Sequence, residues 1–489
     1  MDAIRPRYER APMTDLSTGC RGVVPLRARL APWMSACLAE HAPHALLARY
    51  GSPLNVQSTV PFVAHMQALV DTGAARGLAL TPFFARKANK CLSYVKAARD
   101  NGFGIDAASL AEVQQALDLG VPGTRIVCTA GVKPDALIAL CVARDVTVIV
   151  DNDEELAQLS ARAAGQGTVC RVGLRVAGFE HAGDTLHSRF GYHVDRLATL
   201  IERVLSDHAD TLDLAGLQFH LGGYEHGQRA SAIAGLLPAL GVLAARRRET
   251  NRPTFMDIGG GIPMRYLAEP ADWPAYLQAH GEALDGRRAP ITYNNDALGR
   301  RATPTGGWSA PDAYPTGHDL VQADWMAAVL DTIHAGRPLH AHLAELGVTL
   351  CCEPGRSVLD DCGMTLARVV HVKTDTAGRH VAGVEMNRTQ FRTGFAEVMF
   401  DPCLVAHPER AAGAPLEAYL TGTYCTESEF IFKRRFVFDQ GLARGDTLVL
   451  ANSAGYLVHF LESRSHQFEL AANVFIDADG ALVRDGIDG

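Results

Sequence analysis

Short apolar runs rich in β-branched and aromatic residues recur along the chain. Runs of about four to eight such residues, bounded by turn-forming residues, predict buried β-strands. Eight runs meet this description, at residues 82–85, 102–105, 125–128, 146–150, 169–176, 214–219, 253–258 and 347–352. Three later segments, at residues 368–374, 380–386 and 446–452, are also predicted strands separated by turns.

The segments between the first eight runs have the pattern of helices. Residues 107–120 and 152–165, for example, place apolar residues at helical spacing, open with polar capping residues and end at glycine. Alternating strands and helices favour a parallel sheet, and eight strands favour closure because an open sheet more often stops at about five or six. We therefore predict an α/β fold built on a (β/α)8 barrel of the TIM type.

Polar residues follow each predicted strand, at the end where the catalytic loops of such a barrel open. In chain order they are Lys87, Asp106, Thr129 with Lys133, Asp151, Arg175, His220, Asp257 with Gly259, Gly260 and Gly261, and Glu353 with Gly355 and Arg356. Helix capping explains Asp106 and Asp151 as well as function does, and a lysine at a strand end is most often a solvated cation. Neither reading explains why one rim carries Lys87, His220, Glu353 and Arg356 together, so we expect a site there.

Two glycine-rich stretches, residues 220–224 and 257–263, fall on the same rim. Each alone is more often a tight turn, but successive glycines let backbone N–H groups approach an anion closely. With Arg356 they form a candidate phosphate cradle. A phosphate site beside a lysine and a carboxylate is what pyridoxal phosphate requires.

Composition and charge mainly exclude classes of function. The 489 residues are 47% hydrophobic and 20% charged, and the net charge of −8 with a pI near 6.2 gives no basic surface for nucleic acid. The first residues contain no apolar run of signal-peptide length, and no segment has the roughly 18 uncharged apolar residues of a membrane span. The 11 cysteines lack paired C-x-x-C spacing. We expect a cytoplasmic protein with reduced thiols, without a metal site and without nucleic-acid or membrane partners.

Eight motifs in order give the chain a family resemblance. They are ARKAN around Lys87, GIDAASLAE (104–112), SRFG (188–191), HLGG (220–223), DIGGGIP (257–263), CEPGR (352–356), YCTESE (424–429) and AGY (454–456). Over about residues 45–475 the chain resembles the fold-type III pyridoxal-phosphate decarboxylases, the family of the diaminopimelate, ornithine and arginine decarboxylases. The resemblance implies a segment 1–60 that adds to a β-rich domain, a cofactor-binding barrel at 61–356 with an insertion near 288–319, and a C-terminal β-rich domain, a sandwich or barrel, at 357–489. It also implies a homodimer with shared active sites and an amino-acid substrate.

The resemblance assigns roles to residues on the rim. Lys87 would hold pyridoxal 5′-phosphate as an aldimine, and partial burial beside Phe83 and Phe84 favours its neutral amine. Glu353 would keep the pyridine nitrogen protonated, so that the ring accepts an electron pair as a quinonoid. His220 would stack on the ring, and Cys425 of a partner subunit would protonate Cα. The remaining cofactor contacts are implied for Gly223, Gly260, Gly261, Gly355, Arg356 and Tyr456, with Asp106, Glu112 and Arg175 as a supporting shell.

Three departures from the family pattern concern the aldimine lysine and the substrate. Arg86 replaces the usual small apolar residue before Lys87, and alternation points it away from the site. Thr426 replaces the acid that commonly follows the cysteine, with the candidate substrate ligands Glu427 and Glu429 shifted downstream. The stretch between Gly261 and Glu353 is also longer than the family generally uses. Its excess, residues 288–319, is either a disordered insertion or a loop over the site, with Tyr314 a candidate substrate contact.

Two other functions stay open at this point. A racemase on the related barrel typically sets an arginine against the pyridine nitrogen and uses a tyrosine base, so Glu353 and Cys425 argue against it. A non-catalytic pyridoxal-phosphate-binding protein generally lacks the β-rich domain. We predict a decarboxylase that acts on a diamino acid or on a larger amino-acid-like intermediate. We also expect it to recognise the distal end of its substrate differently from lysine or ornithine decarboxylases.

Overall fold

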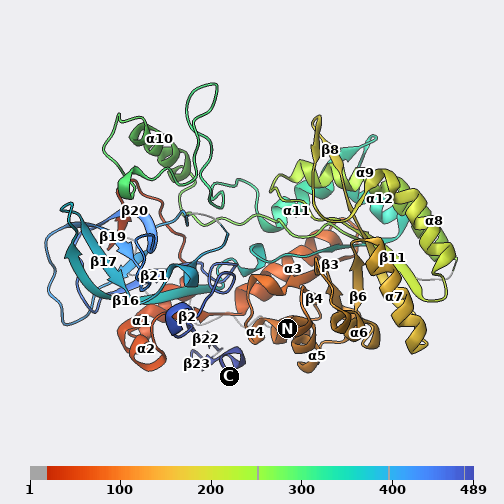
Figure 1. The fold of residues 1–489 in the computed structure, drawn as a ribbon, viewed down its shortest axis with the longest axis horizontal. Helices are drawn as coiled ribbons and strands as arrows, with labels where there is room; N and C mark the ends of the chain where they lie inside the picture. Colours follow the sequence, from red (N-terminus) through yellow and green to blue (C-terminus); the bar gives the residue numbers. More distant parts are fainter. Residues whose placement is uncertain (1–18, 250–252, 395–396, 478) are drawn as a thin grey trace. The chain divides into compact units, whose positions relative to one another are not determined.

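The computed structural model describes residues 19–249, 253–394, 397–477 and 479–489, which form two compact units (Figure 1). The barrel unit comprises residues 62–263 and 320–358. The β-rich unit comprises the residues up to 61, residues 264–319 and those from 359 onward. Residues 1–18 of the expected N-terminal segment lie outside the described residues.

Eight parallel strands close the barrel, because the last strand pairs with the first. In order around the barrel they are β3 (Leu80–Ala85), β4 (Gly104–Ala107), β5 (Ile126–Cys128), β6 (Thr147–Val150), β7 (Cys170–Ala177), β11 (Leu212–Gln218), β12 (Thr254–Asp257) and β15 (Val348–Cys352). Each overlaps one of the eight predicted runs, so the predicted barrel is confirmed. Since all the strands run the same way, the residues that follow them share one rim.

Helices surround these strands (Figure 1). They are α3 (Val60–Ala74), α4 (Leu92–Asp100), α5 (Leu110–Asp118), α6 (Asp135–Ala143), α7 (Asp153–Gln166), α8 (Leu197–Asp207), α9 (His226–Arg248), α11 (Gln322–Asp331) and α12 (Leu339–Leu346). The side chains of Ser109 and Asn152 cap α5 and α7, as their sequences predict. Short strands decorate the unit: β8 (Phe179–His181) with β9 (Asp184–Leu186), β10 (Tyr192–His193) on β7, and β13 (Ile333–His334) with β14 (Arg337–Pro338).

Helix α9 is, among the described residues, the one helix long and apolar enough by length and composition to cross a membrane. Its residues Ile233, Leu236, Leu240 and Leu243 are buried, and it packs against α11, α12 and β11. Its apolar character is therefore accounted for by its place in the outer layer of the barrel.

The interior of the barrel is filled by aromatic rings that need glycine neighbours. A Cβ on Gly104 would stand 2.3 Å from the ring of Phe83, and one on Gly173 would stand 2.7 Å from that of Phe255. Phe83 packs against a buried cluster that includes Val127, Phe255 and Cys351. The space that these glycines leave is therefore occupied by rings beneath the rim.

The β-rich unit is built on a ten-stranded sheet. Along its main path lie β1 (Arg21–Gly22), β20 (Phe430–Phe438), β19 (Leu416–Thr421), β17 (His380–Val384), β16 (Gly363–Thr374), β2 (Leu54–Gln57), β22 (Ala472–Ile476) and β23 (Leu482–Arg484). Strand β21 (Thr447–Leu450) branches from β16, and β18 (Cys403–Val405) pairs with β21. The predicted strands at 368–374, 380–386 and 446–452 correspond to β16, β17 and β21. Strand β2 precedes the barrel in the sequence and pairs with β16 and β22.

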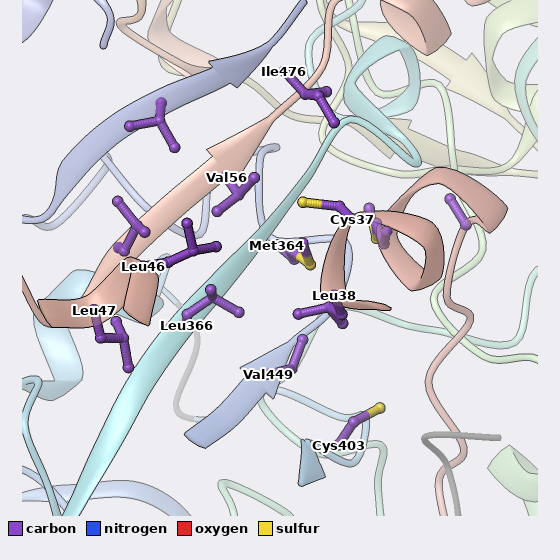
Figure 2. Packing of buried hydrophobic residues seen from close by; sticks show 14 residues of the cluster. Cys37, Leu38, Leu46, Leu47, Val56, Met364, Leu366, Cys403, Val449 and Ile476 are labelled. Atoms are coloured by element: carbon purple, nitrogen blue, oxygen red, sulfur yellow. The ribbon is translucent and has the colours of Figure 1, made fainter. Parts of the chain in front are cut away.

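Two short helices, α1 (Pro32–Glu40) and α2 (Pro43–Tyr50), cover one part of this sheet. Figure 2 shows their side chains packed with those of β2, β16 and β21, including Leu46 and Leu47 of α2 and Leu366 of β16. Each fully buried side chain of this size stabilises the fold by about 1.5–3 kcal/mol. Residues far apart in the sequence thus build one core.

The long stretch after the seventh strand differs from its expected place in the barrel, because residues 264–319 group with the β-rich unit. Helix α10 (Asp272–Leu284) begins it, and the backbone of Thr292 bridges to Arg434 on β20. The ring of Tyr293 lies 4.4 Å from that of Phe430 and 5.2 Å from that of Tyr419. The segment therefore packs on this sheet through an aromatic ring.

Candidate active site

Lys87 lies directly beyond β3, in the short helix η3 (Arg86–Ala88). Its side chain is 35% exposed, and its Nζ is 3.5 Å from Oδ2 of Asp106, which is 1% exposed. Arg86 turns the other way: its guanidinium is buried and donates to the carbonyl of Asn89 and to Oε1 of Gln115. The guanidinium of Arg86 is therefore occupied by hydrogen bonds inside the barrel unit, and the amine of Lys87 stays accessible.

Three carboxylates, those of Asp106, Asp257 and Glu353, are buried on this rim. Burial raises the pKa of Asp257 to about 7, and the charge of Asp106 adds to the rise. Burial and then the charges of Asp257 and Asp106 raise the pKa of Glu353 well above its usual value, while Lys87 opposes the shift. The cluster therefore holds more potential negative charge than the lysine balances, and it would favour a bound group with a positive charge.

Gln218, the last residue of β11, orients Glu353. Its Nε2 donates to Oε1 of Glu353 at 2.8 Å, and both side chains are buried. The backbone N–H of Glu353 donates to the carbonyl of Gly259. The sequence prediction missed Gln218, although its position two residues before His220, at the end of a strand, was a signal that could have found it.

His220 is a neutral ring in this site. Burial lowers its pKa to about 3, and the positive charges of Lys87 and Arg229 add to the effect. Its Nδ1 accepts a hydrogen bond from the N–H of Gly260 at 3.2 Å, which leaves the proton on Nε2. An uncharged imidazole fixed by a backbone N–H is suited to stack on an aromatic cofactor.

Glycines shape the loop that follows β12. Gly261 has a φ of +77°, and a Cβ there would stand 2.1 Å from Nη2 of Arg229. That guanidinium is fully buried and donates to the carbonyls of Leu221 and Gly260, so it ties the two glycine stretches together. Arg229, which the sequence prediction also missed, thus positions the candidate phosphate cradle.

Other residues of the rim make hydrogen bonds, ion pairs and ring contacts within the barrel unit. Asp106 accepts a hydrogen bond from the hydroxyl of Thr129, and Lys133 is buried with Glu155 at 2.9 Å. Arg175 lies with its guanidinium 4.3 Å from the ring centre of Phe190, and its Nε is 4.0 Å from Oδ1 of Asp151. These contacts hold the SRFG motif against β7.

Two residues predicted as members of the site make contacts of the same kind. Glu112 accepts from the N–H of Ala108 at 2.6 Å, which makes it a helix cap as well as a neighbour of Lys87. Arg356 interacts with the hydroxyl of Tyr224, so the end of the CEPGR motif meets the first glycine stretch. Gly223 lies in that stretch, where a Cβ would stand 2.5 Å from Oε1 of Gln228, and Gly355 is buried before Arg356.

The remaining predicted site residues lie in the β-rich unit. Cys425 and Glu427 are exposed, whereas Glu429 is 2% exposed and accepts from the backbone N–H of Arg388. Tyr314 is also buried, and its hydroxyl accepts a hydrogen bond from the N–H of Met264. Tyr456 has a φ of +66° and packs edge-on against Phe460. Glu429 and Tyr314 therefore have structural tasks within their own unit, which the sequence prediction did not foresee.

Comparison with known proteins agrees with this arrangement. Residues 64–292 match the pyridoxal binding domain of pyridoxal-dependent decarboxylases. An uncharacterised protein of Sinorhizobium fredii is 32% identical over 453 residues, covering 90% of this chain and 92% of the relative. The diaminopimelate decarboxylase of Pseudomonas aeruginosa is 25% identical and covers 88% of this chain and 89% of its own length. This chain belongs to the fold-type III pyridoxal-phosphate-dependent decarboxylases.

A solved structure supports the fold of this decarboxylase. That of the diaminopimelate decarboxylase from M. jannaschii in complex with L-lysine aligns with a TM-score of 0.68 at 16% identity, covering 90% of this chain and 91% of that one. At this identity the similarity between the two structures concerns the fold. The predicted fold, enzyme class and cofactor are thus confirmed.

The residues present fit pyridoxal phosphate. The cofactor brings an aldehyde, a basic pyridine nitrogen and a phosphate. The rim offers an accessible amine at Lys87, an excess of buried carboxylates around Glu353, and glycine stretches whose loops exclude side chains. Among the described residues, Oε1 of Gln218 and Nη1 of Arg229 are buried and have no hydrogen-bond partner, which leaves polar atoms for a bound group.

Proposed function

We propose that this decarboxylase removes the α-carboxylate of an amino acid whose distal end differs from that of lysine or ornithine. The observation that carries the proposal is the buried carboxylate cluster facing the accessible amine of Lys87. When bound, pyridoxal phosphate supplies an electron sink for the pair released as the bond to carbon dioxide breaks. A sink of this kind needs a negative charge at the pyridine nitrogen, and a racemase that sets an arginine there would not bury carboxylates instead.

Each residue then has a defined task. Lys87 would hold the cofactor through its amine. Glu353, held by Gln218, keeps a proton at the pyridine nitrogen. His220 supports the ring as a neutral partner, and the backbone N–H groups of the glycine stretches, with Gly223, Gly260 and Gly261, bind the phosphate. Gly355, Arg356 and Tyr456 complete our proposed cofactor contacts.

The substrate proposal rests on the loop around Cys425. The family's usual acid after the cysteine is replaced by Thr426, and Glu429 is buried against Arg388. Glu427 is the exposed carboxylate left in the YCTESE motif. A single acid displaced along the loop suits a longer substrate, or one whose distal end carries an amide or carboxylate rather than a lone ammonium.

A homodimer with shared active sites belongs to the same proposal, in which Cys425 of one subunit protonates Cα in the other. Phe460, Leu461 and Phe468, which follow the AGY motif in the β-rich unit, are between 37% and 49% exposed. A partner subunit would remove these apolar side chains from water. We also retain a cytoplasmic location as part of the proposal.

The test is decarboxylation by the purified protein supplied with pyridoxal phosphate. A panel of diamino, dicarboxylic, amide-bearing and longer amino acids is assayed for carbon dioxide release, with the amine identified by mass spectrometry. At least one class should react. Glu353→Gln should keep the phosphate contacts and bind cofactor while losing on the order of 10²-fold or more in kcat. Exchange or inversion of the α-hydrogen without carbon dioxide release would replace this proposal with a racemase.

A further inference from the structure

Cys425 is distinct among the cysteines of this chain. All 11 lie in the described ranges, ten are buried, and Cys425 is exposed. Its Sγ is 3.2 Å from Nε2 of His466, which lies 41 residues further along the chain in the same unit. A thiol within hydrogen-bond distance of an imidazole can exchange a proton with it directly.

Aromatic stacking holds the His466 ring in place. It stacks on Tyr424 at 5.2 Å and 22°, and on Phe468 at 5.9 Å and 20°. The Tyr424 hydroxyl is itself 3.2 Å from Oγ1 of Thr389. The rings of Tyr424 and Phe468 also lie 6.1 Å apart, so the three rings form one cluster that holds the imidazole although the loop is exposed.

The backbone at His466 is also unusual. His466 and Gln467 have φ values of +59° and +60°, in the left-handed region that disfavours side chains by about 1 kcal/mol or more for each residue. Glycine would relieve this strain but would provide no ring. A strained conformation that sets an imidazole beside an exposed thiol is an observation from which a function can be inferred.

We propose that His466 is a positioning residue that orients the Cys425 thiol and returns its proton after each turnover. The proposal rests on the proposed function, in which Cys425 is the proton donor. The S–H bond breaks as its proton forms the new C–H bond with the electron pair left on Cα, which leaves a thiolate. Nε2–H of the protonated imidazole then gives its proton to that thiolate, and water reprotonates the imidazole. No oxidant or further reactant is needed.

Other charged and titratable groups lie on the loops that carry this pair. The neighbouring loops contribute Tyr424, Glu427, Glu429 paired with Arg388, and Arg464. Glu429 and Arg388 lie 3.6 Å apart and largely offset one another. The substitutions that test the pair therefore leave all of these groups in place.

The first measurement is the alkylation rate of Cys425 by iodoacetamide in the full-length protein, followed by peptide mapping between pH 6 and 9. Two variants separate the possible roles of the imidazole. His466→Phe keeps an aromatic ring packed against Tyr424 and Phe468 but removes the nitrogen, and His466→Gln keeps a hydrogen-bonding group but removes the ring. His380→Gln, at an exposed histidine on β17, is the matched control.

In both His466 variants iodoacetamide should alkylate Cys425 on the order of tenfold more slowly at pH 7, because the positively charged imidazole that stabilises the thiolate is gone. The control should match the wild type. With the best amino acid of the panel, kcat should fall on the order of tenfold, more steeply above pH 8, while KM changes less than twofold. Undiminished alkylation in His466→Phe would overturn the proposal, since the stack alone would then suffice. If no amino acid is decarboxylated, the proposed function fails, whereas the alkylation rates still decide the role of His466.

Discussion

Replacing Asp257 with asparagine should stabilise the cofactor-free protein, although the residue is fully buried in the active-site rim. Its carboxylate accepts a hydrogen bond from the N–H of Gly259 at 2.9 Å, and an asparagine Oδ1 can accept the same bond. The substitution thus removes a charge while the N–H of Gly259 keeps its acceptor. Burial, with the charge of Asp106, raises the pKa of Asp257 from 3.8 to about 7.

The pH dependence of this stabilisation follows from the protons that the folded and the unfolded chain bind. Below pH 3.8 the carboxyl is protonated in both the folded and the unfolded chain, so it carries no penalty. Between pH 3.8 and about 7 the folded state holds a proton that the unfolded state has lost, and stability falls as pH rises, by about 1.4 kcal/mol per pH unit. Asp257→Asn should therefore gain about 2 kcal/mol at pH 5 and at most about 4 kcal/mol from pH 7 upward.

Urea denaturation of the cofactor-free protein at several pH values measures this difference from the transition midpoints. Asp401→Asn is the matched control, because Asp401 is a buried carboxylate paired with Arg434 at 2.7 Å, and its loss should destabilise the protein. An Asp257→Asn variant that is less stable than the wild type at pH 8, or whose gain does not change with pH, would refute the reasoning about the carboxylate cluster.

Three further predictions concern the site and the long segment. Borohydride reduction followed by peptide mapping should place the pyridoxyl group on Lys87, and a modified peptide carrying any other lysine would contradict its role. Mixing inactive Lys87→Ala and Cys425→Ala chains should restore part of the activity, because one site in each mixed dimer receives both intact residues; no recovery despite proven subunit exchange would count against a shared site. Tyr293→Ala should destabilise the β-rich unit by about 2 kcal/mol, through lost packing with Phe430 and Tyr419, whereas exposed Arg301→Ala should have little effect; equal urea midpoints would show that the segment adds no stability.

Much of the fold was predictable because its signals are local. A strand is recognised from its own apolar run and a helix from its own periodicity and caps, so all eight barrel strands were found in the sequence. Their parallel direction then placed Lys87, His220 and Glu353 on one rim before any contact was known. Motifs set the family for the same reason, since each is a contiguous stretch.

The tertiary structure alone decided which side chains meet across the sequence. Gln218 reaches Glu353 across 135 positions. Its place at a strand end before His220 marks it as a rim residue, but the sequence does not show which side chain it meets. Arg229 lies on a helix and was not among the predicted site residues, yet it is buried beneath Gly261. A charge can be buried only where other segments supply hydrogen-bond partners for it. The periodicity of one helix does not show those partners.

The same limit applies to the long segment and to the cysteine. Length and composition left residues 288–319 open between disorder and a loop over the site, whereas Tyr293 places them on the sheet of the β-rich unit. The family pattern pointed to Cys425. Its neighbour His466 lies 41 residues further along the chain, in a left-handed turn that the sequence did not indicate. The sequence determined which groups are available for chemistry, and the folded chain determined their partners, because hydrogen bonds and burial act between residues that are close in space rather than in sequence.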